Sequence, residues 1–224
     1  MRTATEVTEA LRDAGFMPVV TVHDPEDAVP LGEALLRAGL RLVEVTFRTE
    51  AAQRAIIRLR AELPELLVAA GTVIDAETVE RSMDAGAAFV VSPGLNPEVV
   101  DYCVERRIPI VPGANDASEI EVGWTRGVRT FNFFPAQLSG GPAMLQALGR
   151  PFTSVEFLCS GGITPQNLAS YLALPNVVAC AGSWVASPES IVEGRFHQIE
   201  AHARSTADIV RAHRSQPTGA ATKA

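Results

Sequence analysis

Glu44 and Arg48 are the side chains whose types and spacing point most directly to chemistry. They stand four residues apart at the end of an apolar run, LVEVTFR (42–48). A carboxylate placed beside a carbonyl group can move protons on the neighbouring carbon. A guanidinium can hold a substrate carboxylate through two parallel hydrogen bonds, and Thr72 is a candidate second contact for that carboxylate. The pair therefore indicates a keto-acid site, with a plain ion pair at a strand end as the alternative.

Two glycine-containing turns indicate a site for phosphate. Gly161 and Gly162 follow one apolar run, and Gly182 with Ser183 ends the last one. Such turns expose backbone N–H groups, and the N-terminus of a following helix adds a partial positive charge. Together they can bind a phosphate without a lysine. The alternative is that these glycines only make tight turns.

The elements that must position these groups repeat along the chain. Apolar, strand-like runs begin 20 to 27 residues apart, at Met17, Arg41, Leu66, Ala87, Ile108, Val128, Val155 and Val177. They are nearly continuous in apolar residues, as in strands buried on both faces. Helical periods lie between them, for example Leu31, Ala34, Leu35 and Ala38.

Eight strands, each followed by a helix, predict an α/β fold of the (β/α)₈ TIM-barrel type. A doubly wound sheet is the alternative, but VHDPED (22–27) stands where that fold usually has a glycine-rich turn. An extra helix over about 5–14 precedes the first strand. We expect a single barrel domain over 1–214 and a flexible C-terminal tail over 215–224.

Capping residues, prolines and glycines indicate where helices begin and end. Capping residues precede a proline at Asp24-Pro25, Asn96-Pro97, Thr164-Pro165 and Ser187-Pro188, whereas Gly15, Gly39 and Gly86 stand at expected helix ends. Asp116 and Glu119 are interpreted as a helix-capping pair. We expect Cys159, Cys180 and Trp184 to pack in the core.

Composition excludes several classes of function. The chain has 224 residues and a net charge of −7, which argues against a general nucleic-acid or anionic-membrane binder. No apolar run reaches the ~18 residues of a membrane span. The three cysteines include no CxxC pair, which argues against a disulfide framework, and the four histidines lack metal-site spacing. We therefore expect a cytoplasmic protein.

In a barrel of this kind the working residues lie at the carboxyl ends of the strands. The motifs found there resemble those of the KDPG / 4-hydroxy-2-oxoglutarate aldolases. The resemblance extends over about 5–203, in the same order. Its motifs are LVEVTFRTE (42–50), AAGTV (69–73), VSPGL (91–95), VPG (111–113), FNFFPA (131–136), SGGIT (160–164) and AGSW (181–184).

The resemblance implies a lyase that cleaves a phosphorylated or short 2-oxo acid to pyruvate and an aldehyde, in a barrel that is commonly a homotrimer. It assigns roles by position. Proton transfer falls to Glu44, and binding of the pyruvate carboxylate to Arg48 and Thr72. The remaining assignments are Pro93 and Phe134 as pocket lining and Gly161, Gly162 and Ser183 as the phosphate site.

One position departs from the family. The family motif reads FKFFPAE, and its lysine forms a Schiff base with the substrate carbonyl, whereas this chain reads FNFFPAQ (131–137). Asn132 thus stands at the Schiff-base position, and Gln137 replaces a glutamate. An amide nitrogen is conjugated and cannot form an imine. The one lysine of the chain is Lys223, near its end.

Three interpretations follow from this departure. The first, which we favour, is a divergent enzyme in which Glu44 transfers protons on a 2-oxo acid while Asn132 donates a hydrogen bond to the developing oxyanion. The second is an aldolase disabled by loss of its lysine. The third is a non-catalytic protein that binds a sugar-acid phosphate. No cofactor is expected; a divalent metal held by Glu44, Asp116 or His23 is an option without a motif behind it.

Overall fold

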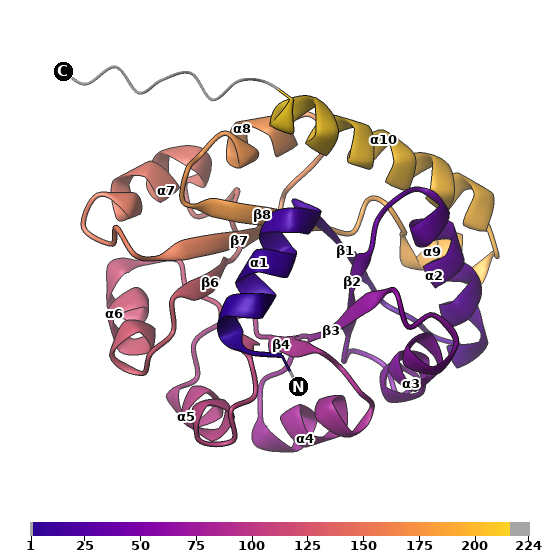
Figure 1. Cartoon of the computed structure of the whole chain (residues 1–224), viewed down its shortest axis with the longest axis horizontal. Helices are drawn as coiled ribbons and strands as arrows, with labels where there is room; N and C mark the ends of the chain where they lie inside the picture. The colour runs from indigo at the N-terminus through magenta and orange to yellow at the C-terminus, as the bar shows by residue number, and fades with distance from the viewer. Residues whose placement is uncertain (1, 216–224) are drawn as a thin grey trace.

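Parallel strands form a ring that is surrounded by helices in the computed structural model, which describes residues 2–215 (Figure 1). The strands are β1 (Phe16–Val20), β2 (Leu42–Thr46), β3 (Leu67–Gly71), β4 (Phe89–Val91), β5 (Ile110–Val111), β6 (Thr130–Phe133), β7 (Glu156–Ser160) and β8 (Val177–Gly182). This is the predicted (β/α)₈ barrel. Of the predicted tail, only Ser215 falls within the described residues, and Lys223 lies outside them.

The helices follow the strands in alternation. They are α1 (Ala4–Ala14), the 3₁₀ turn η1 (Pro25–Asp27), α2 (Ala28–Arg37), α3 (Ala52–Glu62), α4 (Ala76–Asp84), α5 (Pro97–Glu105), α6 (Ala117–Thr125), α7 (Gly141–Gly149), α8 (Leu168–Leu172), α9 (Pro188–Val192) and α10 (Phe196–Arg214). Within residues 2–215, no helix combines the length and apolarity needed to cross a bilayer.

The backbone of Asn132 completes the ring. Neighbouring strands pair in the order β5-β4-β3-β2-β1-β8-β7-β6, which leaves β5 and β6 to meet. There the N–H of Asn132 donates to the carbonyl of Pro112 at 2.8 Å, and its carbonyl accepts from Ala114 at 3.0 Å. The side chain at this position is therefore held at a fixed place on the inner wall.

Alternation along β2 divides its side chains between two cores. Val43 and Val45 pack in the layer between the strands and the surrounding helices, whereas Leu42 belongs to the core inside the ring. Side chains two residues apart point to the same face of a strand. Glu44 therefore shares the inner face with Leu42.

Helix α1 closes one end of the ring, as its position across the strands in Figure 1 shows. Thr3 begins it with a reciprocal capping box to Glu6. Val7 and Leu11 then pack into the inner core, and Thr8 bonds Thr130 at 2.7 Å between hydroxyls. Since this end is filled, the cavity that the strands leave lies at the opposite, carboxyl end.

Most of the predicted helix boundaries are confirmed. Asp24, Asn96 and Ser187 cap η1, α5 and α9 with their side chains. Gly15, Gly39 and Gly86 have φ of +67°, +88° and +90° where helices end. The expected start at Thr164-Pro165 comes too early: residues 165–167 form a turn in which the carbonyl of Thr164 accepts from both Asn167 and Leu168, and α8 begins at Leu168.

Candidate active site

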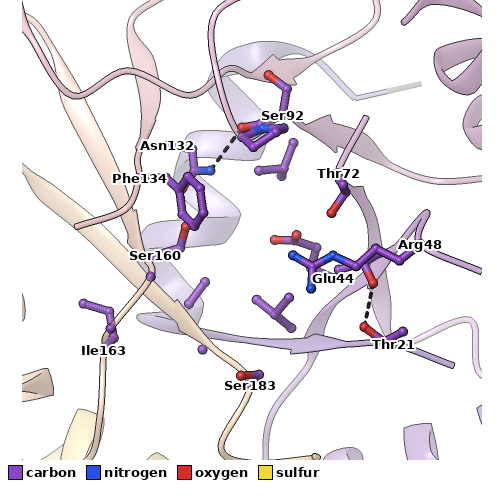
Figure 2. Close-up of a pocket in the computed structure, with 18 of the residues that line it drawn as sticks. Thr21, Glu44, Arg48, Thr72, Ser92, Asn132, Phe134, Ser160, Ile163 and Ser183 are labelled. Atoms are coloured by element: carbon purple, nitrogen blue, oxygen red, sulfur yellow. Dashed lines mark hydrogen bonds between the residues drawn. The ribbon is translucent and has the colours of Figure 1, made fainter. Parts of the chain in front are cut away.

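A cavity of about 260 Å³ opens at the carboxyl ends of the strands. All nine residues that the sequence assigns to the site lie on its wall: Glu44, Arg48, Thr72, Pro93, Asn132, Phe134, Gly161, Gly162 and Ser183. In Figure 2, Glu44, Arg48 and Thr72 face Asn132 and Phe134 across the cavity, and Ser183 lies at its lower edge. The structure therefore gathers these residues at one place, and their individual roles stay predictions.

Glu44 is the buried carboxylate of the cavity. Its side chain is 7% exposed, and burial raises its pKa to about 7, although Arg48 lowers that pKa in part. Gly71 makes room for it, because a Cβ at Gly71 would lie 1.9 Å from Oε1 of Glu44. A carboxyl group with this pKa can both accept and release a proton near neutral pH.

Arg48 and Thr72 lie beside Glu44 on the same wall. The guanidinium of Arg48 points into the cavity (Figure 2). Within residues 2–215, the ion pairs do not include one between Arg48 and Glu44, so the plain-ion-pair alternative is not what the structure has. Thr72 has φ +58°, a left-handed conformation that is costly for a β-branched residue and that tends to occur at functional sites.

Asn132 is fixed by hydrogen bonds at both ends of its amide. Its Nδ2 donates to the carbonyl of Ser92 at 3.1 Å, and its Oδ1 accepts from the hydroxyl of Ser160 at 2.6 Å. The side chain is 4% exposed. An amide nitrogen carries two N–H groups, so one donor remains beside the cavity.

The loops after β7 and β8 form a second polar region. Gly161 and Gly162 have φ of +88° and +81°, a pair of left-handed conformations that only glycine adopts without strain. In the described part of the chain, the N–H groups of Gly162, Ile163 and Ser183 make no hydrogen bond. Unpaired N–H groups of this kind are the usual ligands of a phosphate.

The sequence did not predict Thr21 as a cavity residue, and it offered His23 as an optional metal ligand of the site. β1 ends at Val20, and the chain then turns away toward η1, so His23 is exposed and does not line the cavity. Thr21 lines it instead and bonds Thr46 at 2.9 Å between hydroxyls. Counting inward positions by twos from Val19 would have identified Thr21.

The proposed metal ligands do not come together. Asp116 caps α6 by accepting from the N–H of Glu119, which confirms the capping interpretation, and it does not line the cavity with Glu44. Across residues 2–215, no cluster of three or more His, Cys, Asp and Glu side chains is arranged to hold a metal ion.

The remaining core predictions are confirmed. Trp184 packs against Phe16 with ring centroids 4.6 Å apart, and its indole N–H donates to Thr206. Cys159 and Cys180 are fully buried on adjacent strands, and burial raises the pKa of Cys159 well above its usual range. None of these three side chains takes part in the cavity wall.

Comparison with known proteins gives a consistent result. The aldolase family described as KDPG and KHG aldolase matches residues 7–202. The 2-dehydro-3-deoxy-phosphogluconate aldolases of Treponema pallidum and Haemophilus influenzae are 48% and 41% identical, over 91% and 93% of this chain and 97% and 99% of their own.

Comparison with solved structures indicates the same family. A crystal structure of KDPG aldolase from Legionella pneumophila, with pyruvate captured at low pH as a covalent carbinolamine intermediate, superposes with a TM-score of 0.86 at 36% identity, covering 89% of this chain and 97% of that one. The chain therefore belongs to the KDPG and KHG aldolase family.

Proposed function

We propose that the cavity binds a phosphorylated 2-oxo acid and that Glu44 transfers protons on it without a covalent intermediate. The carboxylate of the ligand binds Arg48 and Thr72. Its phosphate binds the loops of Gly162 and Ser183, and Ile163 of the first loop lies across the cavity from Arg48 (Figure 2). Names of the relatives support this class of ligand, because they are aldolases of 2-dehydro-3-deoxy-phosphogluconate.

Buried Glu44 is the single observation that carries the proposal. Its pKa of about 7 makes both protonation states available at neutral pH. The carboxylate takes a proton from C3 of the 2-oxo acid, and the C–H electron pair forms the C2–C3 double bond of an enolate. The charge that develops on the C2 oxygen is stabilised by the remaining N–H of Asn132 and by the guanidinium of Arg48.

We infer that Asn132 stands at the position of the family's Schiff-base lysine, because FNFFPAQ (131–137) resembles the family motif FKFFPAE. A carbinolamine such as that of the Legionella pneumophila enzyme requires an amine, and the conjugated nitrogen of Asn132 cannot supply one. Loss of a covalent nucleophile costs on the order of 10⁶ in turnover. We therefore expect ordinary aldol cleavage to be very slow.

Deuterium exchange at the pyruvate methyl group tests this proposal. We expect the protein to accelerate the loss of the methyl ¹H NMR signal in D₂O, because enolisation exchanges these protons. Glu44→Gln should abolish the acceleration, while Glu50→Gln, at an exposed glutamate on the loop that follows β2, should keep it. Binding of pyruvate without exchange would overturn the proposal and favour the non-catalytic binding protein.

Two further predictions concern the assembly, which the resemblance implies, and the location in the cell, which the composition indicates. The homotrimer and the cytoplasmic location remain predictions. Sedimentation equilibrium tests the first, because it gives the mass of the assembly in multiples of the 23.8 kDa chain. Cell fractionation tests the second.

A further inference from the structure

A hydrogen-bonded network lies directly behind the glycine loop that follows β7. Oε1 of Gln137 accepts from the hydroxyl of Tyr171 at 2.9 Å and from Nδ2 of Asn167 at 3.2 Å. The same Nδ2 donates to the carbonyl of Gly162 at 3.0 Å, and Oδ1 of Asn167 accepts from the N–H of Thr164 at 2.8 Å. The network therefore bonds the loop at two backbone positions.

These two bonds determine which backbone groups of the loop stay available. Asn167 occupies the carbonyl of Gly162 and the N–H of Thr164, so the intervening N–H of Ile163 and that of Gly162 itself are left without a partner in the described residues. Both residues line the cavity. Without the hydrogen bonds of Asn167, the loop could rotate these N–H groups away from the cavity.

Gln137 supports Asn167 through contact as well as hydrogen bonding. A Cβ at Gly162 would lie 2.5 Å from Cβ of Gln137, and the N–H of Gln137 donates to the carbonyl of Gly161 at 3.0 Å. The chain after β6 and the loop after β7 are thus packed backbone to backbone. The loop cannot change its conformation without disturbing Gln137.

Tyr171 fixes the orientation of the Gln137 amide. Its side chain is fully buried, and burial raises its pKa to about 12, so its hydroxyl is a donor throughout the physiological range. Across residues 2–215, Gln137 is the hydrogen-bond partner of this hydroxyl. A buried hydroxyl without an acceptor is costly, so Oε1 of Gln137 is held toward Tyr171 and Asn167.

We propose that Gln137 is a positioning residue that acts through Asn167 to hold the 161–164 loop in its phosphate-binding conformation, and so sets the preference for phosphorylated over unphosphorylated 2-oxo acids. This inference rests on the proposed function, since it needs phosphate to bind this loop. It places the determinant of that preference behind the cavity, because Gln137, Asn167 and Tyr171 do not line it.

Calorimetric titration with three ligands tests this role. The ligands are 2-dehydro-3-deoxy-6-phosphogluconate, its unphosphorylated counterpart 2-dehydro-3-deoxygluconate, and pyruvate. The ratio of the first two affinities measures how much the phosphate group adds to binding. The affinity for pyruvate measures binding of the carboxylate at Arg48 and Thr72. Gln137→Ala should lower the ratio at least about tenfold (~1.4 kcal/mol), as expected for one lost charge-assisted hydrogen bond, and leave the affinity for pyruvate unchanged.

Two matched variants separate positioning from general damage. Gln137→Glu keeps an acceptor for both donors, so the ratio should stay within about threefold of the wild-type value. Gln166→Ala, at an exposed glutamine of the same loop, should leave the ratio unchanged. A Gln137→Ala protein that keeps the wild-type ratio would overturn the inference, and so would equal losses for all three ligands.

The affinities of the wild-type protein separate a failure of the phosphate site from a failure of the Gln137 role. A preference for the phosphorylated acid that survives Gln137→Ala refutes the positioning role and leaves the proposed phosphate site intact. Equal affinity of the wild-type protein for both acids refutes the phosphate site and the positioning role together. Exchange of the pyruvate methyl protons stays an independent measure of Glu44 in either case.

Discussion

Replacing Glu44 by glutamine should change how the stability of the protein depends on pH. Burial raises the pKa of Glu44 from 4.5 to about 7. One pKa unit corresponds to ~1.36 kcal/mol, so this shift corresponds to about 3 kcal/mol. Between these two pKa values the folded protein holds a proton that the unfolded chain has released, so the stabilisation is present below pH 4.5 and is lost as pH rises through 7.

Chemical denaturation of both proteins at a series of pH values between about 4.5 and 8.5 measures this effect. Glutamine does not titrate, so the free energy of unfolding of Glu44→Gln minus that of the wild-type protein should increase by about 3 kcal/mol across this interval. Other titrating groups are common to both proteins and cancel in the difference. A difference that stays constant within about 0.5 kcal/mol would refute the raised pKa of Glu44 and the reasoning that depends on it.

Three other variants test the same site. Arg48→Gln should raise the midpoint of the pH profile for methyl exchange, because Arg48 lowers the pKa of Glu44; an unchanged midpoint would contradict this effect of Arg48. The same variant should bind pyruvate more weakly in calorimetry. Gly71→Ala should lower the free energy of unfolding by about 1–3 kcal/mol in denaturant titration, because its Cβ would overlap the Glu44 carboxylate. The same overlap should abolish exchange of the pyruvate methyl protons, and a wild-type exchange rate would exclude this packing. Asn132→Lys should gain borohydride trapping of pyruvate, detected as added mass, and retro-aldol cleavage in a coupled assay; no gain would mean that the rest of the pocket has moved too far from that of an aldolase.

The barrel itself could be predicted because its strands are buried on both faces. Continuous apolar runs separated by helical periods gave strand starts that lie within two residues of those in the structure, such as Phe89 for the run beginning at Ala87. A closed barrel requires β5 and β6 to be neighbours, but the form of their contact could not be predicted. It depends on a bond pattern through Asn132 that only the assembled ring defines.

The wall of the cavity could be predicted from strand ends and from the family resemblance together. Glu44 and Asn132 each stand between outward-facing apolar neighbours, so their inward direction follows from alternation. The errors came from loops. His23 was considered as a metal ligand of the site although the chain turns away after Val20, and residues 165–167 form a turn before α8 begins at Leu168.

The hydrogen-bonded network behind the cavity could not be predicted from the sequence. Gln137 was noticed only as a departure from the family motif, and Asn167 not at all. Their hydrogen bond joins residues 30 positions apart, and the bond to Tyr171 spans 34 positions. No local pattern encodes contacts of that separation. The left-handed backbone of Thr72 is likewise imposed by its surroundings and not by its residue type.

Mass spectrometry after treatment with pyruvate and borohydride measures whether the protein forms a covalent bond to its ligand. The wild-type protein should keep its mass, because Asn132 cannot form an imine and the chain offers no lysine in residues 2–215. A parallel sample without borohydride should exchange the methyl protons of pyruvate in D₂O. A stoichiometric pyruvate adduct at any residue would refute non-covalent binding, because it would show that the protein attacks its ligand covalently.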